Sequence, residues 1–505
     1  MMDSREFFRK YANPKEFDRV VEMDTVVDMW KRCREEYPDL VAIEDNGNKY
    51  TYQDLDRDMA SFRGALKAKG IQKGSRVGVF ARNSYDLVKM YLAVVTLGAC
   101  AAILPAHLDE KTIFGVSLKF NLKGLVYTPD MEEKVQFAKD HNPNLVLLSS
   151  LEEGEPVEMT EDLTKNDPAV IMFTGGTTGR SKGALLSNGA LMQGTVNGCY
   201  GVWDIFYQRY ILILPLSHVF GLVRNLMTSL YTGSDLYICR NNKDMFKDIA
   251  IFRPTILVLV PAIAEMALNL SKQFNKNMLG DSLKYIICGA AKVAPYLILE
   301  YKKIGIELLA GYGLTESANL VSGNPESLAK PDSVGYPYPH QEFRVVNDEL
   351  WIKGENMMDG YVGEEGANEE AYEDGWFKTG DLVKFDEDGY LYITGRCKEI
   401  IVLSNGENVS PAEVESYFNA LDIVQDSQLF EDVDENGRHF LALEVVPRMV
   451  ELAKINVEDK MAYLMEELKR VNATLVPHER AERIIIRDKD FERTPAMKIV
   501  RYHKC

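Results

Sequence analysis

Short apolar runs recur through the N-terminal part of the chain, separated by segments long enough to form helices, and this pattern constrains the fold most. The runs are Val77–Phe80, Ala102–Leu104, Leu125–Tyr127, Leu145–Leu148, Val170–Phe173, Ile211–Leu214, Leu236–Ile238, Ile256–Val260, Tyr285–Ile287 and Ile306–Leu309. A strand that is apolar throughout belongs to a sheet covered on both faces. A strand with one solvent-exposed face instead alternates apolar and polar residues. The pattern therefore predicts an α/β fold with covered sheets.

One unit of this pattern is clear in detail. The strand Val77–Phe80 is followed by Asn83, which stands where a helix N-cap is expected, and by a helix through Leu87 and Val94. The next apolar run, Ala102–Leu104, then supplies a second strand. This order predicts a βαβ unit.

The pattern of apolar residues changes after Gly335. Alternating segments separated by turn sequences predict antiparallel hairpins, at Phe343–Val346, Glu349–Ile352 and Tyr390–Ile393. From Lys398 we expect a small α+β domain, with a helix at Pro411–Phe418, a hairpin turn at 434–437 and a helix at Glu458–Val471. We therefore predict a large N-terminal domain over residues 1–396, with βαβ subdomains and an antiparallel β region, and a C-terminal domain over residues 397–505.

Composition narrows the possible functions. The net charge of −18 offers no basic face for nucleic acid or an anionic membrane. The longest apolar stretch, Ala93–Leu104, is shorter than the roughly 17–25 residues of a membrane helix, so we expect no integral membrane segment. The seven cysteines are scattered without a C-x-x-C pair, as in reduced cytosolic proteins. We expect a cytoplasmic protein.

The segment IMFTGGTTGRSKGALLSN, residues 171–188, carries the strongest chemical signal. A strand runs directly into a loop rich in glycine and hydroxyl side chains, which offers backbone N–H groups and a lysine to an anion. Its candidate phosphate-binding residues are Thr174, Gly175, Gly176, Thr177, Thr178, Gly179 and Lys182. The Walker pattern requires lysine directly after glycine, but Arg180 and Ser181 intervene here. The loop therefore predicts a phosphate site of another kind.

Several further segments, in the same order, make the chain similar to the adenylate-forming superfamily of acyl-CoA synthetases, luciferases and peptide-synthetase adenylation domains. They are LPLSHVFG (214–221), GYGLTES (311–317), GWFKTGD (375–381), GRCKEII (395–401), NGENVSPAEVE (405–415) and RTPAMKIVR (493–501). The resemblance spans nearly the whole chain. It implies a large ATP- and acid-binding domain and a small mobile C-terminal domain.

The resemblance also implies roles for individual residues. Lys498 is implied as the catalytic lysine that stabilises charge at the α-phosphate. Glu316, an acid on a glycine turn after a strand, is implied as the magnesium ligand, with Thr178 as phosphate and metal neighbour. His218 is implied as the gate of the carboxylate pocket.

The remaining roles concern the nucleotide and the thiol. Tyr312 would stack on adenine, beside the small residues Gly289, Ala290 and Ala291, and Gly313 and Thr315 belong to the same motif. Asp381, in a glycine-bounded turn, and Arg396 are implied at the ribose. Lys398 is implied as the hinge about which the small domain swings, and Gly406 would line the thiol tunnel.

Departures from the family pattern bear on rate and specificity. Gly175 stands where Ser is usual, Ser181 where Pro is usual, and Met497 where Gly is common. Amino-acid-activating relatives place an Asp near Val219 to pair with the substrate amine, and its absence argues against amino-acid substrates. Glu407 stands where many long-chain fatty acid members carry Lys.

We therefore predict an AMP-forming acid–thiol ligase that uses ATP and Mg²⁺ to activate a fatty or other apolar carboxylic acid. Coenzyme A is the expected acceptor. A carrier protein bearing phosphopantetheine is the alternative acceptor. A nucleotide-binding protein without turnover is the alternative from another class.

Overall fold

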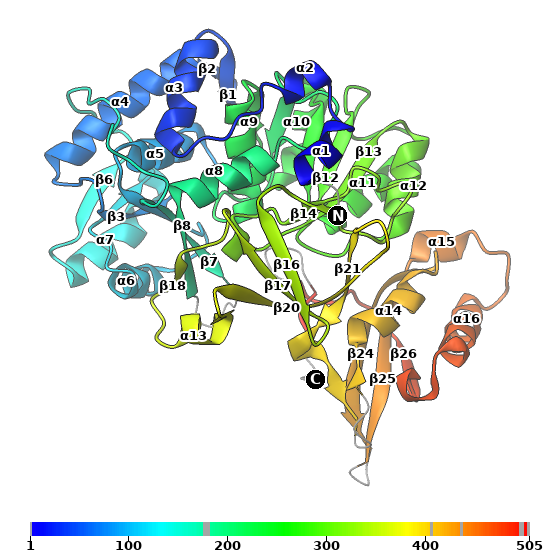
Figure 1. Ribbon diagram of the computed structural model, residues 1–505. Helices are drawn as coiled ribbons and strands as arrows, with labels where there is room; N and C mark the ends of the chain where they lie inside the picture. The colour runs from blue at the N-terminus through cyan, green and yellow to red at the C-terminus, as the bar shows by residue number, and fades with distance from the viewer. Residues whose placement is uncertain (1–2, 175–181, 404–407, 435–437, 494–498, 502–505) are drawn as a thin grey trace.

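The computed structural model describes residues 3–174, 182–403, 408–434, 438–493 and 499–501 (Figure 1). The polypeptide forms two large mixed sheets flanked by helices, an antiparallel sheet, and a smaller C-terminal region seen at the lower right in orange and red. This arrangement confirms the predicted mixed α/β class.

The first mixed sheet has parallel strands at its centre and antiparallel strands at both edges. Its strands, in spatial order, are β15 (Tyr336–Pro337), β14 (Ser322–Gly323), β13 (Glu307–Tyr312), β12 (Tyr285–Cys288), β11 (Ile256–Leu259), β9 (Arg209–Leu212), β10 (Asp235–Ile238), β1 (Val41–Asp45) and β2 (Asn48–Thr51). The pairs from β13 to β1 are parallel. Strands β11 and β12 are buried along their whole length, as their apolar sequences predict.

The second mixed sheet is built in the same way. Its spatial order is β18 (Gly360–Val362), β8 (Lys182–Ser187), β7 (Pro168–Thr174), β4 (Cys100–Leu104), β3 (Arg76–Phe80), β5 (Gly124–Tyr127) and β6 (Val146–Ser149). Strands β7 to β6 are parallel, while β8 and β18 are antiparallel to their neighbours. The glycine-rich loop therefore joins the antiparallel strands β7 and β8, rather than a strand and a helix.

Helices fill the connections and cover these sheets (Figure 1). Those of the N-terminal part are α1 (Ser4–Arg9), α2 (Pro14–Phe17), α3 (Val26–Glu36), α4 (Tyr52–Ala68), α5 (Tyr85–Thr96), α6 (Glu110–Lys119), α7 (Glu132–His141), α8 (Asn188–Asn197), the π-helix η2 (Phe220–Met227), α9 (Thr228–Tyr231), α10 (Met245–Phe252), α11 (Pro261–Phe274), α12 (Pro295–Lys303) and α13 (Ala367–Ala371). Short 3-10 turns are η1 (Pro129–Met131), η3 (Asn242–Asp244), η4 (Thr315–Ser317), η5 (Cys397–Glu399) and η6 (Pro477–Glu479).

The βαβ unit β3–α5–β4 confirms the predicted one, except for its N-cap. Ser84 caps α5 by accepting the backbone N–H of Leu87. Asn83, which we expected at the cap, bonds to the backbone of Leu214 and Leu216 instead. Its amide thereby ties the start of α5 to the loop that carries His218.

The region after Gly335 forms the predicted antiparallel hairpins. Its strands are β16 (Gln341–Val346), β17 (Glu349–Gly354), β20 (Trp376–Phe385) and β19 (Tyr372–Glu373), with β21 (Leu391–Arg396) also on β20. In Figure 1 these strands lie between the helical body and the C-terminal region.

The C-terminal region has a sheet and a hydrophobic cluster of its own. Its elements are β22 (Ile401–Val402), β23 (Asn408–Val409), α14 (Pro411–Asn419), β24 (Val424–Val433), β25 (His439–Pro447), α15 (Met449–Ala453), α16 (Lys460–Thr474) and β26 (Arg483–Ile486). The cluster draws its buried side chains from residues 401–481. The domain boundary at residues 396 and 397 stays a prediction.

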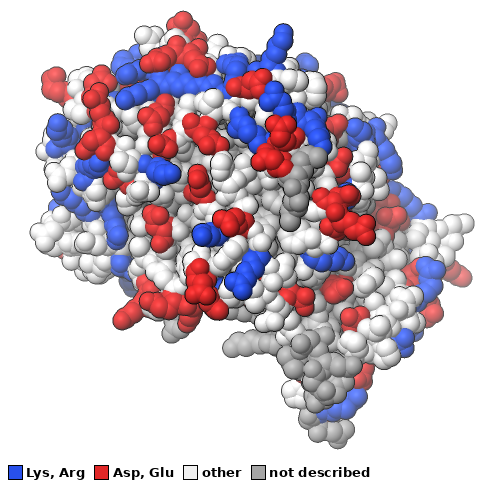
Figure 2. All heavy atoms as spheres, in the orientation of Figure 1, with Lys and Arg blue, Asp and Glu red and all other residues white. Residues whose placement is uncertain are grey.

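Within the described residues, the helices all lack the length and continuous apolarity needed to cross a bilayer. Acidic side chains are interspersed with basic ones over the face in Figure 2. The cytoplasmic location stays a prediction.

Candidate active site

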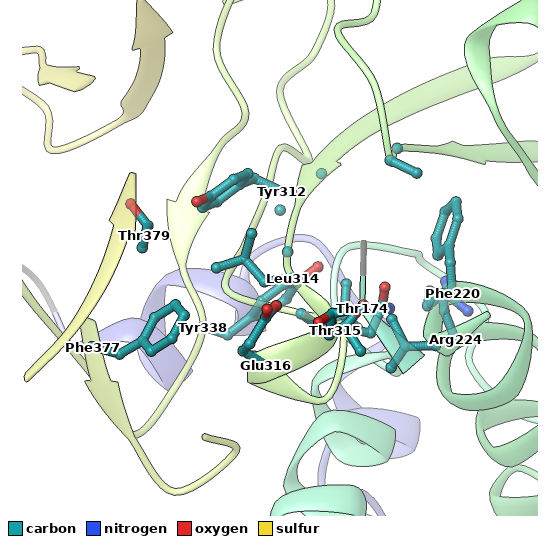
Figure 3. A pocket seen from close by; sticks show the side chains of 18 of the residues that line it. Thr174, Phe220, Arg224, Tyr312, Leu314, Thr315, Glu316, Tyr338, Phe377 and Thr379 are labelled. Carbon is teal, nitrogen blue, oxygen red and sulfur yellow. The ribbon is translucent and has the colours of Figure 1, made fainter. Parts of the chain in front are cut away.

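A cavity of about 820 Å³ lies where the carboxyl ends of strands from the two mixed sheets meet. Thr174 ends β7, Gly289 follows β12, and Gly313 follows β13, and all three line the cavity. Figure 3 shows Phe377 and Thr379 of the antiparallel sheet at one end, Phe220 and Arg224 at the other, and Glu316 between them. Ligand sites of open α/β sheets lie in this position, at the carboxyl ends of the strands.

The cavity brings together most of the described residues that the sequence marks as functional. Those that line it are Thr174, Lys182, His218, Gly289, Ala290, Tyr312, Gly313, Thr315, Glu316 and Arg396. Ala291 is exposed and lies outside this wall, and Lys398 lies in η5. Gly175, Gly176, Thr177, Thr178, Gly179, Gly406 and Lys498 lie outside the described residues.

Lys182, Tyr361 and Glu316 form one polar group in this wall. The Tyr361 hydroxyl donates to Oε1 of Glu316 over 2.6 Å. The ammonium of Lys182, the first residue of β8, lies 4.9 Å from the centroid of the Tyr361 ring. Burial and the neighbouring Glu316 carboxylate raise the pKa of Tyr361, so its phenol keeps its proton and acts as the donor.

A second polar group joins Tyr312, Asp381 and Arg396. The Tyr312 hydroxyl donates to Oδ2 of Asp381 and Nε of Arg396 donates to Oδ1, each over 2.6 Å. Asp381, which we expected in a turn, lies in strand β20 directly after Gly380, whose φ is +70°. The carboxylate is buried, while the Arg396 side chain is half exposed, so Asp381 anchors two side chains that line the cavity.

Close backbone packing explains two of the small residues near the expected adenine site. A Cβ on Gly313 would lie 1.1 Å from the carbonyl oxygen of Asn319, so only glycine fits there. A Cβ on Gly289 would lie 3.3 Å from the carbonyl oxygen of Gly311, which leaves little room. The end of β12 therefore packs closely on β13, and Gly313 packs closely on the turn that follows β13.

His218 and Arg224 reach the cavity from one segment. His218 is exposed, and its carbonyl accepts the backbone N–H of Leu222 at the start of the π-helix η2. A π-helix widens the backbone turn and is frequent at functional sites. Arg224, within this helix, is 2% exposed and also lines the cavity.

The donor set fits a magnesium ion held partly by substrate. Among the residues that the structure describes, there is no group of three or more His, Cys, Asp or Glu side chains able to hold a metal. Glu316 is nevertheless a carboxylate in the cavity wall, and Mg²⁺ in nucleotide sites is bound through one or two carboxylates plus phosphate oxygens. Glu316 is thus sufficient as a protein anchor for that kind of site.

Sequence reasoning missed several residues of the cavity wall, among them Tyr361, Arg224, Asn319 and Tyr338. Arg224 gave a usable signal, since it is a single cation in the otherwise uncharged segment HVFGLVRNLM. Tyr361 gave none, because it bonds to a residue 45 positions away.

Family comparisons match both parts of the chain. Residues 30–362 match the family described as AMP-binding enzyme, and residues 398–504 match its companion, the AMP-binding enzyme C-terminal domain.

Individual proteins show the same similarity. Long-chain-fatty-acid–CoA ligase FadD15 of Mycobacterium bovis is 28% identical, covering 73% of this chain and 72% of its own. Oxalate–CoA ligase of Arabidopsis thaliana is also 28% identical, covering 89% of this chain and 93% of its own. The structure of ATP-bound MatB from Rhodopseudomonas palustris has a TM-score of 0.81 at 24% identity and covers 94% of this chain and 97% of its own, which shows a shared fold.

Proposed function

Since this chain belongs to the family of AMP-binding enzymes, we propose that it is an AMP-forming acid–thiol ligase. A carboxylate oxygen of the acid attacks the α-phosphorus of ATP, pyrophosphate leaves, and an acyl-adenylate forms. A thiol then attacks the acyl carbonyl, which gives a thioester and releases AMP with one oxygen of the acid.

One observation carries this proposal: a single cavity is lined by Lys182, Tyr361 and Glu316 of the first polar group and by Tyr312 and Arg396 of the second, which the buried Asp381 joins. The first group offers a cation and a carboxylate to a phosphate and its metal. The second offers the Tyr312 ring and the Arg396 guanidinium to a nucleoside, both held by the buried Asp381 carboxylate. Because both groups border one cavity, together they are suited to a nucleoside triphosphate.

We assign the ATP contacts accordingly. Lys182 neutralises phosphate charge at the start of β8, and Asp381 positions Arg396 at the ribose. A bound Mg²⁺, held by Glu316, supplies further neutralisation of the phosphate oxygens. We propose Lys498 as the lysine that stabilises charge at the α-phosphate during adenylation, with Thr178 beside the phosphates.

Adenylation and thioester formation need different side chains around the same acyl-adenylate. We propose that residues 397–505 form a domain that swings about Lys398 between the two steps. In one position Lys498 reaches the reacting phosphate for adenylation. In the other position the thiol passes Gly406 and reaches the acyl-adenylate. In the structure this region contacts the body through Arg448, whose Nη2 lies 2.9 Å from Oε1 of Glu265 in α11. A swing has to break or rebuild that ion pair.

Coenzyme A is the acceptor that the similar proteins favour, since FadD15, the oxalate ligase and an indoleacetate ligase of Aromatoleum aromaticum are all named CoA ligases. Their acids differ widely, from long-chain fatty acids to oxalate. A fatty or other apolar acid, which the sequence favours, is therefore one class among several for this cavity.

The test is acid-dependent release of pyrophosphate from ATP and Mg²⁺ across fatty, aromatic and dicarboxylic acids. We expect release with at least one class, thioester formation on addition of CoA, and loss of both with Lys498→Ala. Thioester formed only on a phosphopantetheine carrier protein would replace CoA as the acceptor. If no acid promoted release, the protein would not be an acid ligase, and ATP binding alone would then identify a nucleotide-binding protein.

A further inference from the structure

Arg224 is a buried cation that has no counter-charge among the described residues, and it lies at the end of the cavity away from Thr379 (Figure 3). The residue is 2% exposed, and its Nη1 has no hydrogen-bond partner among the described residues. None of the salt bridges found between described residues involves this guanidinium. An arginine does not give up its proton in a protein, so the positive charge persists.

The groups that surround Arg224 are neutral. Burial raises the pKa of the Cys199 thiol and of the Tyr338 phenol to about 12 each. Burial also raises the pKa of Tyr210, although the charge and a hydrogen bond of Arg224 act in the opposite direction. At neutral pH these neighbours therefore provide dipoles but no negative charge.

A second donor without a partner lies in the same cavity wall. Asn319 is 6% exposed, and its side-chain nitrogen has no hydrogen-bond partner among the described residues. Its backbone is fixed in the left-handed region with φ +86°, and the carbonyl oxygen of Asn319 occupies the space beside Gly313. The backbone position that carries this amide is thus fixed two residues after the turn that carries Glu316.

A buried charge without a counter-charge, and buried N–H groups without an acceptor, are costly unless a ligand satisfies them. Both residues border this cavity, so an acceptor that enters it reaches both of them.

We propose that Arg224, helped by Asn319, binds a second anionic group of the substrate acid, so that the preferred substrates are dicarboxylates or acids with a comparable second acidic group. This inference rests on the proposed ligase function. The reacting carboxylate meets ATP beside Thr174, where the glycine-rich loop begins, and the second carboxylate lies at Arg224. A carboxylate suits this site because guanidinium pairs with it through two parallel hydrogen bonds.

The experiment compares pairs of acids that differ at one end. Each pair contains a dicarboxylic acid and the same molecule with its far carboxylate replaced by a carboxamide, and pyrophosphate release is measured with ATP and Mg²⁺. We expect kcat/KM for the best dicarboxylate to exceed that of its amide by about 100-fold or more, because a site built for a charged partner rejects an analogue lacking it. Arg224→Met should bring this ratio close to 1.

Arg209→Met is the matched control. Arg209 in β9 is a partly buried arginine whose Nε also has no hydrogen-bond partner in the described part of the chain, yet it does not line the cavity. Its substitution should leave the ratio as in the unaltered protein. If Arg224→Met does not fold, the ratio measured with the unaltered protein still decides the matter.

The outcomes separate this inference from the proposed function. Release with neutral-tailed acids and a ratio near 1 in the unaltered protein would overturn the inference and leave the ligase intact. Equal losses for both members of a pair in Arg224→Met would assign Arg224 to the reacting carboxylate, which also overturns it. No release with any acid would instead refute the ligase.

Discussion

The hydroxyl of Tyr361 donates a 2.6 Å hydrogen bond to Oε1 of Glu316. This bond joins β18, the edge strand beside β8, to the turn after β13, and it leaves the other carboxylate oxygen of Glu316 for a metal. The proposed magnesium anchor is therefore oriented by a residue from a strand of the other mixed sheet.

Tyr361→Phe should weaken magnesium binding and catalysis together. Without its donor the Glu316 carboxylate loses its fixed orientation, and we expect about a 10-fold rise in the Mg²⁺ concentration needed for half-maximal pyrophosphate release. The measurement is a Mg²⁺ titration at saturating ATP and acid.

Tyr372→Phe is the control for that variant. Tyr372 also lies near Glu316, but its hydroxyl donates to the backbone carbonyl of Met358. The Tyr372→Phe variant should need the same Mg²⁺ concentration for half-maximal pyrophosphate release as the unaltered protein. An equal shift in both phenylalanine variants would show that general loosening of this wall, and not the bond to Glu316, sets the metal affinity.

Asp381→Asn should raise KM for ATP more than it lowers kcat. The amide cannot accept strongly from both Tyr312 and Arg396, and hydrogen bonds to charged groups contribute about 1.5–3 kcal/mol each, so we expect a roughly 10- to 100-fold rise in KM. Steady-state kinetics with varied ATP test this. A variant with normal KM would remove Asp381 and its two partners from nucleotide binding.

Gly313→Ala should destabilise the protein and disturb the site. Its new methyl group would overlap the carbonyl of Asn319, and overpacking of this kind costs about 1–3 kcal/mol or more. Gly115→Ala, within helix α6 and facing open space, should instead add about 0.5–1 kcal/mol through helix propensity. Thermal unfolding should move in opposite directions for the two variants, and a shared direction would contradict the packing at Gly313.

Asp235 should make stability fall as pH rises through the neutral range. Burial, followed by the charge of Glu44, raises the pKa of Asp235 to about 7, so between about pH 4 and 7 the folded protein binds more protons than the unfolded chain. Stability is therefore lost as the carboxyl ionises. Asp235→Asn should raise the thermal midpoint at pH 8, and this gain should disappear toward pH 4.

Asp54 provides a control whose effect on stability should change with pH in the opposite direction. Hydrogen bonds from the backbone N–H and hydroxyl of Thr51 lower the pKa of Asp54, so its contribution is present at neutral pH and lost in acid. Asp54→Asn should lower the thermal midpoint at pH 8 and have less effect near pH 3. Identical pH trends for the two variants would contradict these assignments.

The sequence predicted the sheets well because buried parallel strands have a simple signature. The runs at Val77–Phe80 and Ile256–Val260 both became strands, with ends shifted by one residue. The exact ends of helices and strands depend on contacts between distant residues, which the order of apolar and polar residues does not show. Asn83 is as good an N-cap residue as Ser84, but its amide bonds to the loop after β9 instead.

The site was predictable only where a motif placed residues next to one another in sequence. The loop around Lys182 and the turn around Glu316 were found in that way. Tyr361 and Asn319 were not, because Tyr361 acts through a bond to a residue 45 positions away and Asn319 is marked only by its place in the cavity wall. Arg224 was visible as a charge in an apolar segment, but its burial, with Nη1 unpartnered among the residues that the structure describes, appears only in three dimensions.

The most direct test of the ligase mechanism follows oxygen from the acid. With a substrate acid labelled with ¹⁸O in its reacting carboxylate, and with ATP, Mg²⁺ and CoA, mass spectrometry of the products should find one ¹⁸O in AMP and none in pyrophosphate. That result requires the carboxylate to attack the α-phosphorus and the acyl–oxygen bond to break when AMP leaves, and the thioester found with it identifies the thiol as the acyl acceptor. Label in inorganic phosphate, with ADP as the nucleotide product, would instead show an acyl-phosphate route and contradict the account.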